Sequence, residues 1–270
     1  MSDQAHTLFE IKDSIGVLTL NRPERLNAMS NQMLQEIRGV LDIVEDPESG
    51  VRCLMITGAG KGFCSGADLA GGGLPDVKDK KAAGKIDLGK TLERDYNPII
   101  ERLAALRVPI VNAVNGGAAG AGCSLAIAAD IVIAAKSAYF LQAFINIGIV
   151  PDAGSSYFLP RRIGEARAMA MMMLGEKIPA ETALDWGLIY EVVDDEALMD
   201  RAMEIATKLA NGPTRSIALI RNMANQSMGN SLTQQLHLER VYQRDAGRGP
   251  EFREGVTAFL EKRKADFTKV

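Results

Sequence analysis

The stretch "VPIVNAVNGGAAGAGCSLAIAADIVIAA", residues 108–135, combines strand-like and helix-like sequence in one short unit. Its apolar runs at 108–116 and 129–135 are rich in Val, Ile and Ala and predict two buried strands. Between them, the small residues at 115–125 predict a glycine turn that leads into a helix. A strand, a turn, a helix and a second strand in this order indicate the α/β class.

The segments on the N-terminal side repeat this alternation. "TLFEI" (7–11) and "IGVLTLN" (15–21) predict a hairpin, and Ser30 precedes apolar residues at helical spacing. Another buried strand is predicted at 51–58. The sequence therefore predicts a core built from repeated ββα units.

The pattern changes near Leu198, from which point it is helical to the end of the chain. We therefore predict two regions, a ββα-repeat core at 1–197 and a helical region at 198–270. No low-complexity linker separates them, so the helical region is expected to pack on the core or on a neighbouring chain.

Composition excludes several classes of function. The 270 residues are 47% hydrophobic and 24% charged, which is typical of a soluble globular protein. A net charge of −3 lacks the basic excess of a nucleic-acid-binding surface. We see neither an apolar run long enough to span a membrane nor a signal peptide, and we therefore expect a cytoplasmic protein with no nucleic-acid or membrane partner.

Cysteine and histidine are scarce. Cys53, Cys64 and Cys123 are an odd set in apolar or small-residue surroundings, which indicates free buried thiols. With only His6 and His237, a Ser-His-Asp triad has few candidates, and no Cys or His pair has the spacing of metal ligands. We expect no metal site.

Two glycine-bearing turns could bind a developing negative charge. "GFCSGADL" (62–69) and "NGGAAGAGCSL" (115–125) each follow a predicted strand and precede helix-like sequence. Such turns leave backbone N–H groups without partners and let a ligand approach the main chain closely. If two N–H groups converge, each stabilises an oxyanion by roughly 3–4 kcal/mol. Close packing of helix on strand is the alternative explanation for either turn alone.

A lone carboxylate stands in "IVPDAGSSYFLP", residues 149–160. Asp152 has no obvious charge partner nearby, and an apolar stretch leads into it. It could serve as a general base whose pKa is raised by the apolar neighbours Phe140, Phe144, Ile145, Ile149 and Val150. Taken alone, this segment favours the other explanation, in which Asp152 is the N-cap of a helix that begins near Ala153.

Several segments together resemble the crotonase family of enoyl-CoA hydratases and isomerases. They are "LNRPERLNAMS" (20–30), "GFCSGADL" (62–69), "AVNGGAAGAGCSLAIAADIVIA" (113–134) and "FLEKRKADF" (259–267), in the family's order. Within the family, these segments with "HLERVYQRDAGR" (237–248) look most like the ring-1,2-epoxyphenylacetyl-CoA isomerases. The resemblance implies a crotonase-like ββα spiral that holds the thioester carbonyl with two main-chain N–H groups, those of Ala67 and Ala121.

The resemblance also implies how the rest of the substrate is bound. A group of residues would meet its coenzyme A part: Arg25, Cys64, Ser65, Gly66, Ala67 and Asp68. For Asp68 the residues themselves favour a helix N-cap just after the glycine turn. Coenzyme A would enter as part of the substrate, with no permanently bound cofactor. The family further implies a homotrimer or a dimer of trimers, assembled through 198–270.

Departures from the family pattern decide the expected chemistry. Hydratases of this family use two glutamates, and gap-free matching puts Ser124 and Phe144 at their positions. Neither side chain can act as a general base. Asp152 falls where the isomerase branch places its acid, and one carboxylate suffices to move a proton between two carbons. We therefore expect an acyl-CoA isomerase in which Asp152 is the acid/base.

The resemblance implies two reactions for such a site. One converts 1,2-epoxyphenylacetyl-CoA into oxepin-CoA, and the other converts a 3-enoyl-CoA into a trans-2-enoyl-CoA. Phe140, Phe144 and Tyr157 are candidates for the acyl pocket, although each could be an ordinary core residue. An enoyl-CoA hydratase and a catalytically silent acyl-CoA-binding subunit are the alternative functions.

Overall fold

The computed structural model describes residues 4–69 and 87–270 and contains two β-sheets. The larger sheet has six strands in the order β1-β2-β3-β5-β7-β10. Their bounds are β1 Thr7–Lys12, β2 Ile15–Leu20, β3 Cys53–Gly58, β5 Ile110–Val114, β7 Ile131–Ala135 and β10 Glu191–Val193. The predicted hairpin of β1 and β2 is antiparallel, and the remaining pairs in this sheet are parallel.

The smaller sheet has four strands in the order β4-β6-β8-β9. Their bounds are β4 Gly62–Cys64, β6 Gly117–Ala119, β8 Tyr139–Leu141 and β9 Lys177–Pro179. In each repeat the chain places one strand in the larger sheet and the next in the smaller sheet, as in β3 and β4, β5 and β6, and β7 and β8. The predicted α/β class and ββα repeat are confirmed.

The helices follow these strand pairs. Their bounds are α1 Asn31–Glu45, α2 Leu88–Thr91, α3 Asn97–Ala105, α4 Ala121–Ile127, α5 Ser155–Leu174, α6 Ala180–Asp185, α7 Leu198–Ala210, α8 Thr214–Ser227, α9 Leu232–Gly247 and α10 Pro250–Leu260. Helix α1 begins as predicted, because the side chain of Ser30 accepts a hydrogen bond from the N–H of Met33.

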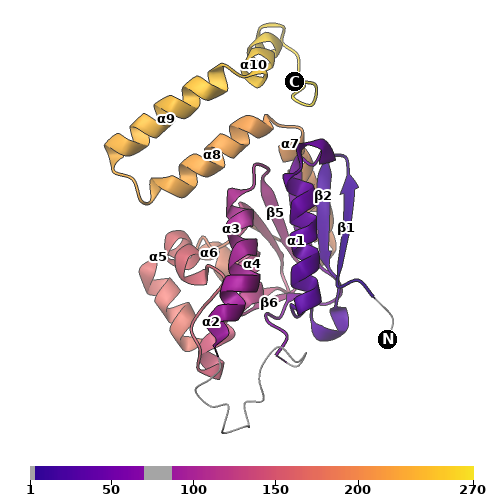
Figure 1. The fold of residues 1–270 in the computed structure, drawn as a ribbon, viewed down its shortest axis with the longest axis vertical. Coiled ribbons are helices and arrows are strands. Elements are labelled where there is room, and N and C mark those ends of the chain that lie inside the picture. Colours follow the sequence, from indigo (N-terminus) through magenta and orange to yellow (C-terminus); the bar gives the residue numbers. More distant parts are fainter. Residues whose placement is uncertain (1–3, 70–86) are drawn as a thin grey trace.

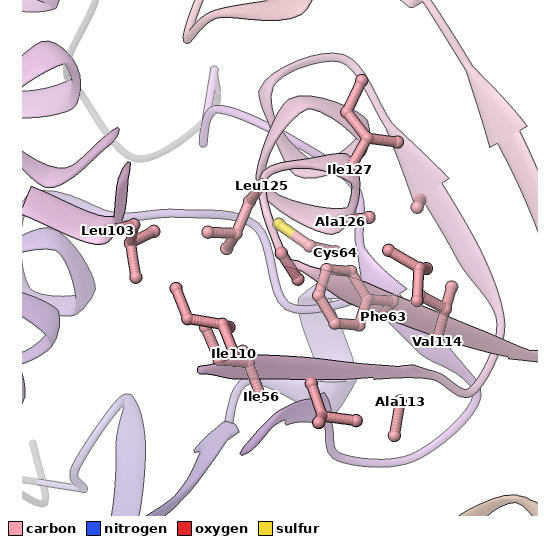
Figure 2. Close-up of a cluster of buried hydrophobic side chains, with 14 of the residues drawn as sticks. Ile56, Phe63, Cys64, Leu103, Ile110, Ala113, Val114, Leu125, Ala126 and Ile127 are labelled. Carbon is pink, nitrogen blue, oxygen red and sulfur yellow. The ribbon is translucent and has the colours of Figure 1, made fainter. Parts of the chain in front are cut away.

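The core lies where the two sheets and the helices meet. Figure 2 shows one cluster of buried apolar side chains that come from β3, β4, β5, α3 and α4. Phe63 of β4 and Ile110 of β5 are at most 1% exposed within it. Burial of such side chains contributes about 1.5–3 kcal/mol each, so this cluster holds β4 and α4 firmly against the larger sheet.

The C-terminal helices fall into two groups. Helix α7 packs against the larger sheet and buries Leu198, Ala202 and Ala206 in the core. Helices α8, α9 and α10 lie together at one end of the molecule, beyond α1 and α3 (Figure 1). Arg221 of α8 joins them to the core, since its guanidinium pairs with Asp130 at 2.7 Å and also donates to the carbonyl groups of Leu103 and Leu106.

Within residues 4–69 and 87–270, no helix combines the length and the apolar character that crossing a membrane requires.

Candidate active site

The two glycine turns predicted from the sequence lie side by side. They follow β4 and β6, which are parallel neighbours in the smaller sheet. Gly66 has a φ of +97°, and a Cβ at this position would lie 2.9 Å from the carbonyl oxygen of Ala119 and 3.4 Å from the nitrogen of Ala121. Only glycine allows this close approach without strain. The first turn therefore packs directly on the second.

Among the described residues, the N–H groups of Ala67 and Ala121 have no partner in regular structure. Ala121 is the first residue of α4, where an N–H has no acceptor within the helix. Ala67 pairs with Met29 in an isolated parallel bridge, in which Gly66 C=O and Asp68 N–H make the hydrogen bonds to Met29. The N–H of the bridged residue itself points away from the partner strand in such a pair. Both groups are thus available at adjacent turns.

Asp152 lies on a tight turn at the start of α5. The Asp152 C=O accepts the Ser155 N–H at 3.0 Å, and the two residues between them, Ala153 and Gly154, have φ of +47° and +85°. A left-handed alanine costs about 1–2 kcal/mol, so the surroundings must hold it in place. Helix α5 begins at Ser155 with Gly154 at its N-cap and no side-chain cap bond. The expectation that Asp152 could cap a helix near Ala153 is therefore wrong.

The carboxyl group of Asp152 has an oxygen that is unpaired among the described residues and a raised pKa. Its Oδ1 is buried, and no donor among the described residues reaches it. Burial raises the pKa of Asp152 to about 6. The predicted direction of the shift is confirmed, although Val150, one of its expected causes, is 78% exposed. A carboxylate that is ionised near neutral pH and still binds a proton readily is suited to acid/base chemistry.

A small apolar pocket connects the acid turn to the glycine turn. Ala153, next to the acid, and Ala121 line it together with Met29, Leu34, Ile37, Tyr96, Ile99, Ile100 and Leu125. Its volume is only about 10 Å³, which is at the lower limit for one water molecule. These residues line the small pocket between the two turns.

Tyr96 is the one lining residue with a polar group. It ends a π-helical segment, Leu92–Tyr96, and such segments often occur at functional sites. Burial raises the pKa of Tyr96, and the charge of Asp152 raises it further, so its hydroxyl stays protonated. Sequence reasoning missed Tyr96, because no motif marks it and a π-helical turn leaves no periodic signal.

The three residues predicted for the acyl pocket have different environments. Phe144 is 5% exposed and lies at the glycine turn, since a Cβ at Gly120 would be 3.9 Å from its ring. Phe140 is fully buried in β8 as part of the core. Tyr157 is 47% exposed on α5, with the Arg161 guanidinium 3.7 Å from its ring centre. Phe140 and Tyr157 do not line the small pocket, and their assignment to the acyl pocket stays a prediction.

The segment expected to meet coenzyme A has a mixed environment. Arg25 and Ser65 are exposed and adjacent, and the Ser65 hydroxyl donates to the Arg25 carbonyl at 3.3 Å. The Cys64 thiol is buried and donates to the Asn27 carbonyl at 3.1 Å, so only its backbone could meet a ligand. The Asp68 carboxylate pairs with Arg22 at 2.8 Å. A helix capped by Asp68 would fall on 70–86, outside the described residues.

At the two positions matched by sequence to the hydratase glutamates, neither side chain is a carboxylate. Ser124 is fully buried in α4, and its hydroxyl contacts Ser155 Oγ at 2.6 Å and the Asp152 carbonyl at 3.0 Å. Phe144 is apolar. Neither side chain is placed to hold and activate a water molecule.

The three cysteines are buried and free, as predicted. Burial raises the pKa of Cys53, Cys64 and Cys123 to about 12 in each case. Thiols in this state are protonated at neutral pH and are not nucleophiles. In the described part of the chain, no three His, Cys, Asp or Glu side chains gather as a metal site would require.

Comparisons with known proteins agree with this geometry. The family model for enoyl-CoA hydratase/isomerase matches residues 10–270. The 1,2-epoxyphenylacetyl-CoA isomerase of Escherichia coli is 48% identical over 261 residues, which are 97% of each chain. A Rhodobacter capsulatus protein named as a probable enoyl-CoA hydratase is 42% identical over 97% of this chain and 98% of its own.

The solved structure of an enoyl-CoA hydratase from Bacillus anthracis superposes with a TM-score of 0.88 at 29% identity. The match covers 98% of this chain and all of the other. Sequence and structure thus agree over nearly the full length, and the chain belongs to the enoyl-CoA hydratase/isomerase family, also called the crotonase family.

Proposed function

We propose that the chain is an acyl-CoA isomerase in which Asp152 moves a proton while the N–H groups of Ala67 and Ala121 bind the thioester oxygen. One observation carries the proposal. One carboxylate oxygen of Asp152, Oδ1, is buried without a hydrogen-bond donor among the described residues, and the next residue, Ala153, borders the same pocket as Ala121. An uncommitted carboxylate beside a pair of free N–H groups can act on a carbon next to the carbonyl.

The reaction on a 3-enoyl-CoA would proceed in two steps. The Asp152 carboxylate removes a proton from C2, and the electron pair moves to the thioester oxygen, which the two N–H groups stabilise as a dienolate. The carboxylic acid then returns the proton to C4, which leaves the double bond between C2 and C3. The carboxylate is regenerated, and product and substrate contain the same atoms.

Hydration is less well supported by the same residues. Addition of water needs one group to take its proton and another to protonate carbon. The Ser124 hydroxyl is buried and already bonded, and Phe144 has no polar group. Asp152 alone can move a proton between two carbons. For hydration it could take the proton of water, but no second group would then protonate the carbon.

For the physiological substrate, we propose 1,2-epoxyphenylacetyl-CoA, isomerised to oxepin-CoA. The support is the 48% identical Escherichia coli relative that bears this name. The C–C bond shared by the epoxide and the six-membered ring would open, with its electrons shifting within the ring, to give the seven-membered ring. Asp152 would move a proton from the carbon next to the thioester carbonyl to a ring carbon, through an enolate held by the two N–H groups. Coenzyme A would enter with the substrate and meet Arg25 and Ser65, both exposed beside the first glycine turn, and no permanent cofactor would be needed.

We further propose a cytoplasmic homotrimer, or a pair of trimers, assembled through α8, α9 and α10. Helices α8–α10 enclose a large apolar groove of about 960 Å³. Among its lining residues, Leu236, Phe252 and Phe259 are each more than half exposed. Covering such side chains is a general driving force for association.

The Asp152→Asn variant tests the proposed chemistry. It keeps the shape of the side chain but cannot accept the proton, so we expect isomerisation of 3-enoyl-CoA and of the epoxide to fall at least about 100-fold. Asp200→Asn, at an exposed position on α7, is the matched control and should retain full activity. In the unmodified enzyme, kcat/KM should fall about tenfold per pH unit below pH 6, because Asp152 becomes protonated.

Two results would refute this mechanism. One is an Asp152→Asn variant that isomerises both substrates at the normal rate. The other is hydration of crotonyl-CoA by the unmodified enzyme at a rate faster than its isomerisation reactions. Binding of acyl-CoA without turnover of any of these substrates would indicate a silent binding subunit instead.

A further inference from the structure

Three buried polar side chains form a chain of hydrogen bonds that ends on the acid turn. Gln142, Ser155 and Ser124 are all fully buried. Gln142 Nε2 donates to Ser155 Oγ at 3.0 Å, Ser155 Oγ lies 2.6 Å from Ser124 Oγ, and Ser124 Oγ donates to the Asp152 carbonyl at 3.0 Å. The amide nitrogen of Gln142 can only donate. Because the Ser124 hydroxyl has one hydrogen and donates it to the Asp152 carbonyl, the Ser155 hydroxyl donates to Ser124.

Ser124 also belongs to the second glycine turn. Its backbone N–H donates to the Gly120 carbonyl at 3.1 Å, and its hydroxyl has the same carbonyl as a longer alternative at 3.3 Å. The Ser124 side chain therefore lies between the turn that holds the Ala121 N–H and the turn that holds Asp152. It is the direct link between these two parts of the site.

The Asp152 carboxyl group depends on its backbone for its position. No donor in the described residues holds its Oδ1, so its location follows from the turn that carries it. That turn includes Ala153 in the left-handed region, a conformation that alanine adopts only when its surroundings impose it. A hydrogen bond to the Asp152 carbonyl restrains the same peptide unit from which the side chain projects.

Packing alone does not account for this chain. A buried amide is unfavourable unless its hydrogen bonds are made, and Gln142 Oε1 has no partner among the described residues. An apolar side chain at the position of Gln142 would fill the core at less cost. The polar chain makes sense if it serves to orient the Ser155 and Ser124 hydroxyl groups.

We propose that Ser124 is a positioning residue that fixes the acid turn relative to the two N–H groups, and that Gln142 and Ser155 orient its hydroxyl. The inference rests on the proposed function, because it assigns Ser124 a task in the same proton transfer. The residue that stands at a glutamate position of the hydratases thus acts through the backbone of Asp152 and does not touch the substrate.

Ser124→Ala and Ser155→Ala test this inference against a matched control. Ser124→Ala should lower kcat for 3-enoyl-CoA about 10–100-fold, since a misplacement of about 1 Å can cost 100-fold, with KM changed less than about threefold. Ser155→Ala should have a smaller effect, because Ser124 can still donate to Asp152. Thr57→Val removes another buried hydroxyl, which donates to the Ala113 carbonyl at 2.9 Å in the larger sheet, and should leave kcat unchanged.

A second measurement separates positioning from loss of stability. The pKa of Asp152 can be followed by NMR of its labelled carboxyl carbon in the folded protein. In Ser124→Ala the loosened turn admits water, so this pKa should fall from about 6 toward the usual value near 4. In Thr57→Val it should not move. Tyr96 is the titratable group coupled to Asp152, and it stays neutral throughout the titration.

The possible results distinguish this inference from the proposed function. If Asp152→Asn is inactive while Ser124→Ala keeps its kcat and its Asp152 pKa, the inference is wrong and the proposed function stands. If Asp152→Asn is fully active, the proposed function is wrong. The positioning role would then fall with it, because Ser124 would have no proton transfer by Asp152 to serve.

Discussion

The two sheets of this molecule differ in both length and content. In the larger sheet, β3, β5 and β7 have six, five and five residues, and all but one of these residues are buried. In the smaller sheet, β4, β6 and β8 have three residues each. Long buried strands contribute stability through packing, whereas three-residue strands contribute little beyond their own hydrogen bonds.

Each of the three short strands β4, β6 and β8 leads directly into a part of the candidate site. Strand β4 precedes Gly66 and Ala67, β6 precedes Gly120 and Ala121, and β8 precedes Gln142. The chain leaves the smaller sheet early, and the backbone groups that pairing would have used become available to a ligand. The comparison indicates that the larger sheet is the scaffold and that the chemistry lies where the pairing of the smaller sheet ends.

Among the substitutions that test the separate roles of the two sheets, Gly66→Ala should cause the largest loss of activity. The new Cβ would meet the Ala119 carbonyl at 2.9 Å, and φ at this position is +97°. The two turns must move apart, and loss of one oxyanion donor lowers kcat about 100–1,000-fold. Steady-state kinetics with 3-enoyl-CoA measures this change.

Gly39→Ala is the control, because Gly39 lies in α1 and a Cβ there meets nothing within 4 Å. It should leave kcat unchanged and stabilise the helix by up to about 1 kcal/mol. If Gly66→Ala and Gly39→Ala have the same kcat, the smaller sheet does not carry the oxyanion site.

A substitution in the larger sheet should lower the stability of the protein and leave kcat nearly unchanged. Leu54 of β3 is fully buried, so Leu54→Ala should lower the free energy of unfolding by about 3 kcal/mol. The kcat of the folded fraction should stay within twofold of normal. Denaturant unfolding and kinetics on the same sample provide both values.

Leu8→Ala, at a 52% exposed position in β1, should change the unfolding free energy by less than about 0.5 kcal/mol. A large loss of kcat in Leu54→Ala without unfolding would show that the larger sheet takes part in positioning the site. The assignment of the larger sheet as scaffold alone would then be wrong.

The smallest effect concerns the stability cost of the acid itself. Burial raises the pKa of Asp152 to about 6 in the folded state, above the value near 4 in the unfolded state. The folded state therefore binds the proton more tightly than the unfolded state does. Protonation of Asp152 thus contributes to the free energy of unfolding fully below pH 4, and this contribution is lost as pH rises through 6. Asp152→Asn should be more stable than the unmodified protein at pH 7.5, by about 1–2 kcal/mol.

This difference should shrink as pH falls to 4, which unfolding curves at several pH values would reveal. Equal stability of the two proteins at pH 7.5 would mean that burial does not raise the pKa of the carboxyl group. A more stable but inactive variant would instead identify Asp152 as a residue kept for activity at a cost in stability.

The scaffold could be predicted from the sequence to a large extent. The hairpin of β1 and β2, the strands β3, β5 and β7, and the helices from α7 to α10 follow from periodicity and from long apolar runs. The turns at Gly66 and Gly120 were also found, because glycine and alanine next to a strand are visible in one sequence. The expected lack of a second proton-transfer group, based on Ser124 and Phe144, stays a prediction.

The surroundings of Asp152 could not be predicted in the same way. Its turn places α5 two residues later than expected, and the positive φ of Ala153 has no sequence signature. Tyr96 reaches the pocket through a π-helical turn, and Gln142 meets Ser155 across 13 residues of chain. Contacts of this kind depend on how separate elements pack, which local sequence patterns do not encode.

Arg221 makes α8 indispensable to the rest of the molecule. A chain truncated after α7 would leave the Asp130 carboxylate without its partner at 2.7 Å and the carbonyl groups of Leu103 and Leu106 without their donor. Asp130 also accepts the backbone N–H of Ile110 at 2.7 Å, so the damage would reach the first residue of β5. Removal of the C-terminal helices would therefore destabilise the core as well.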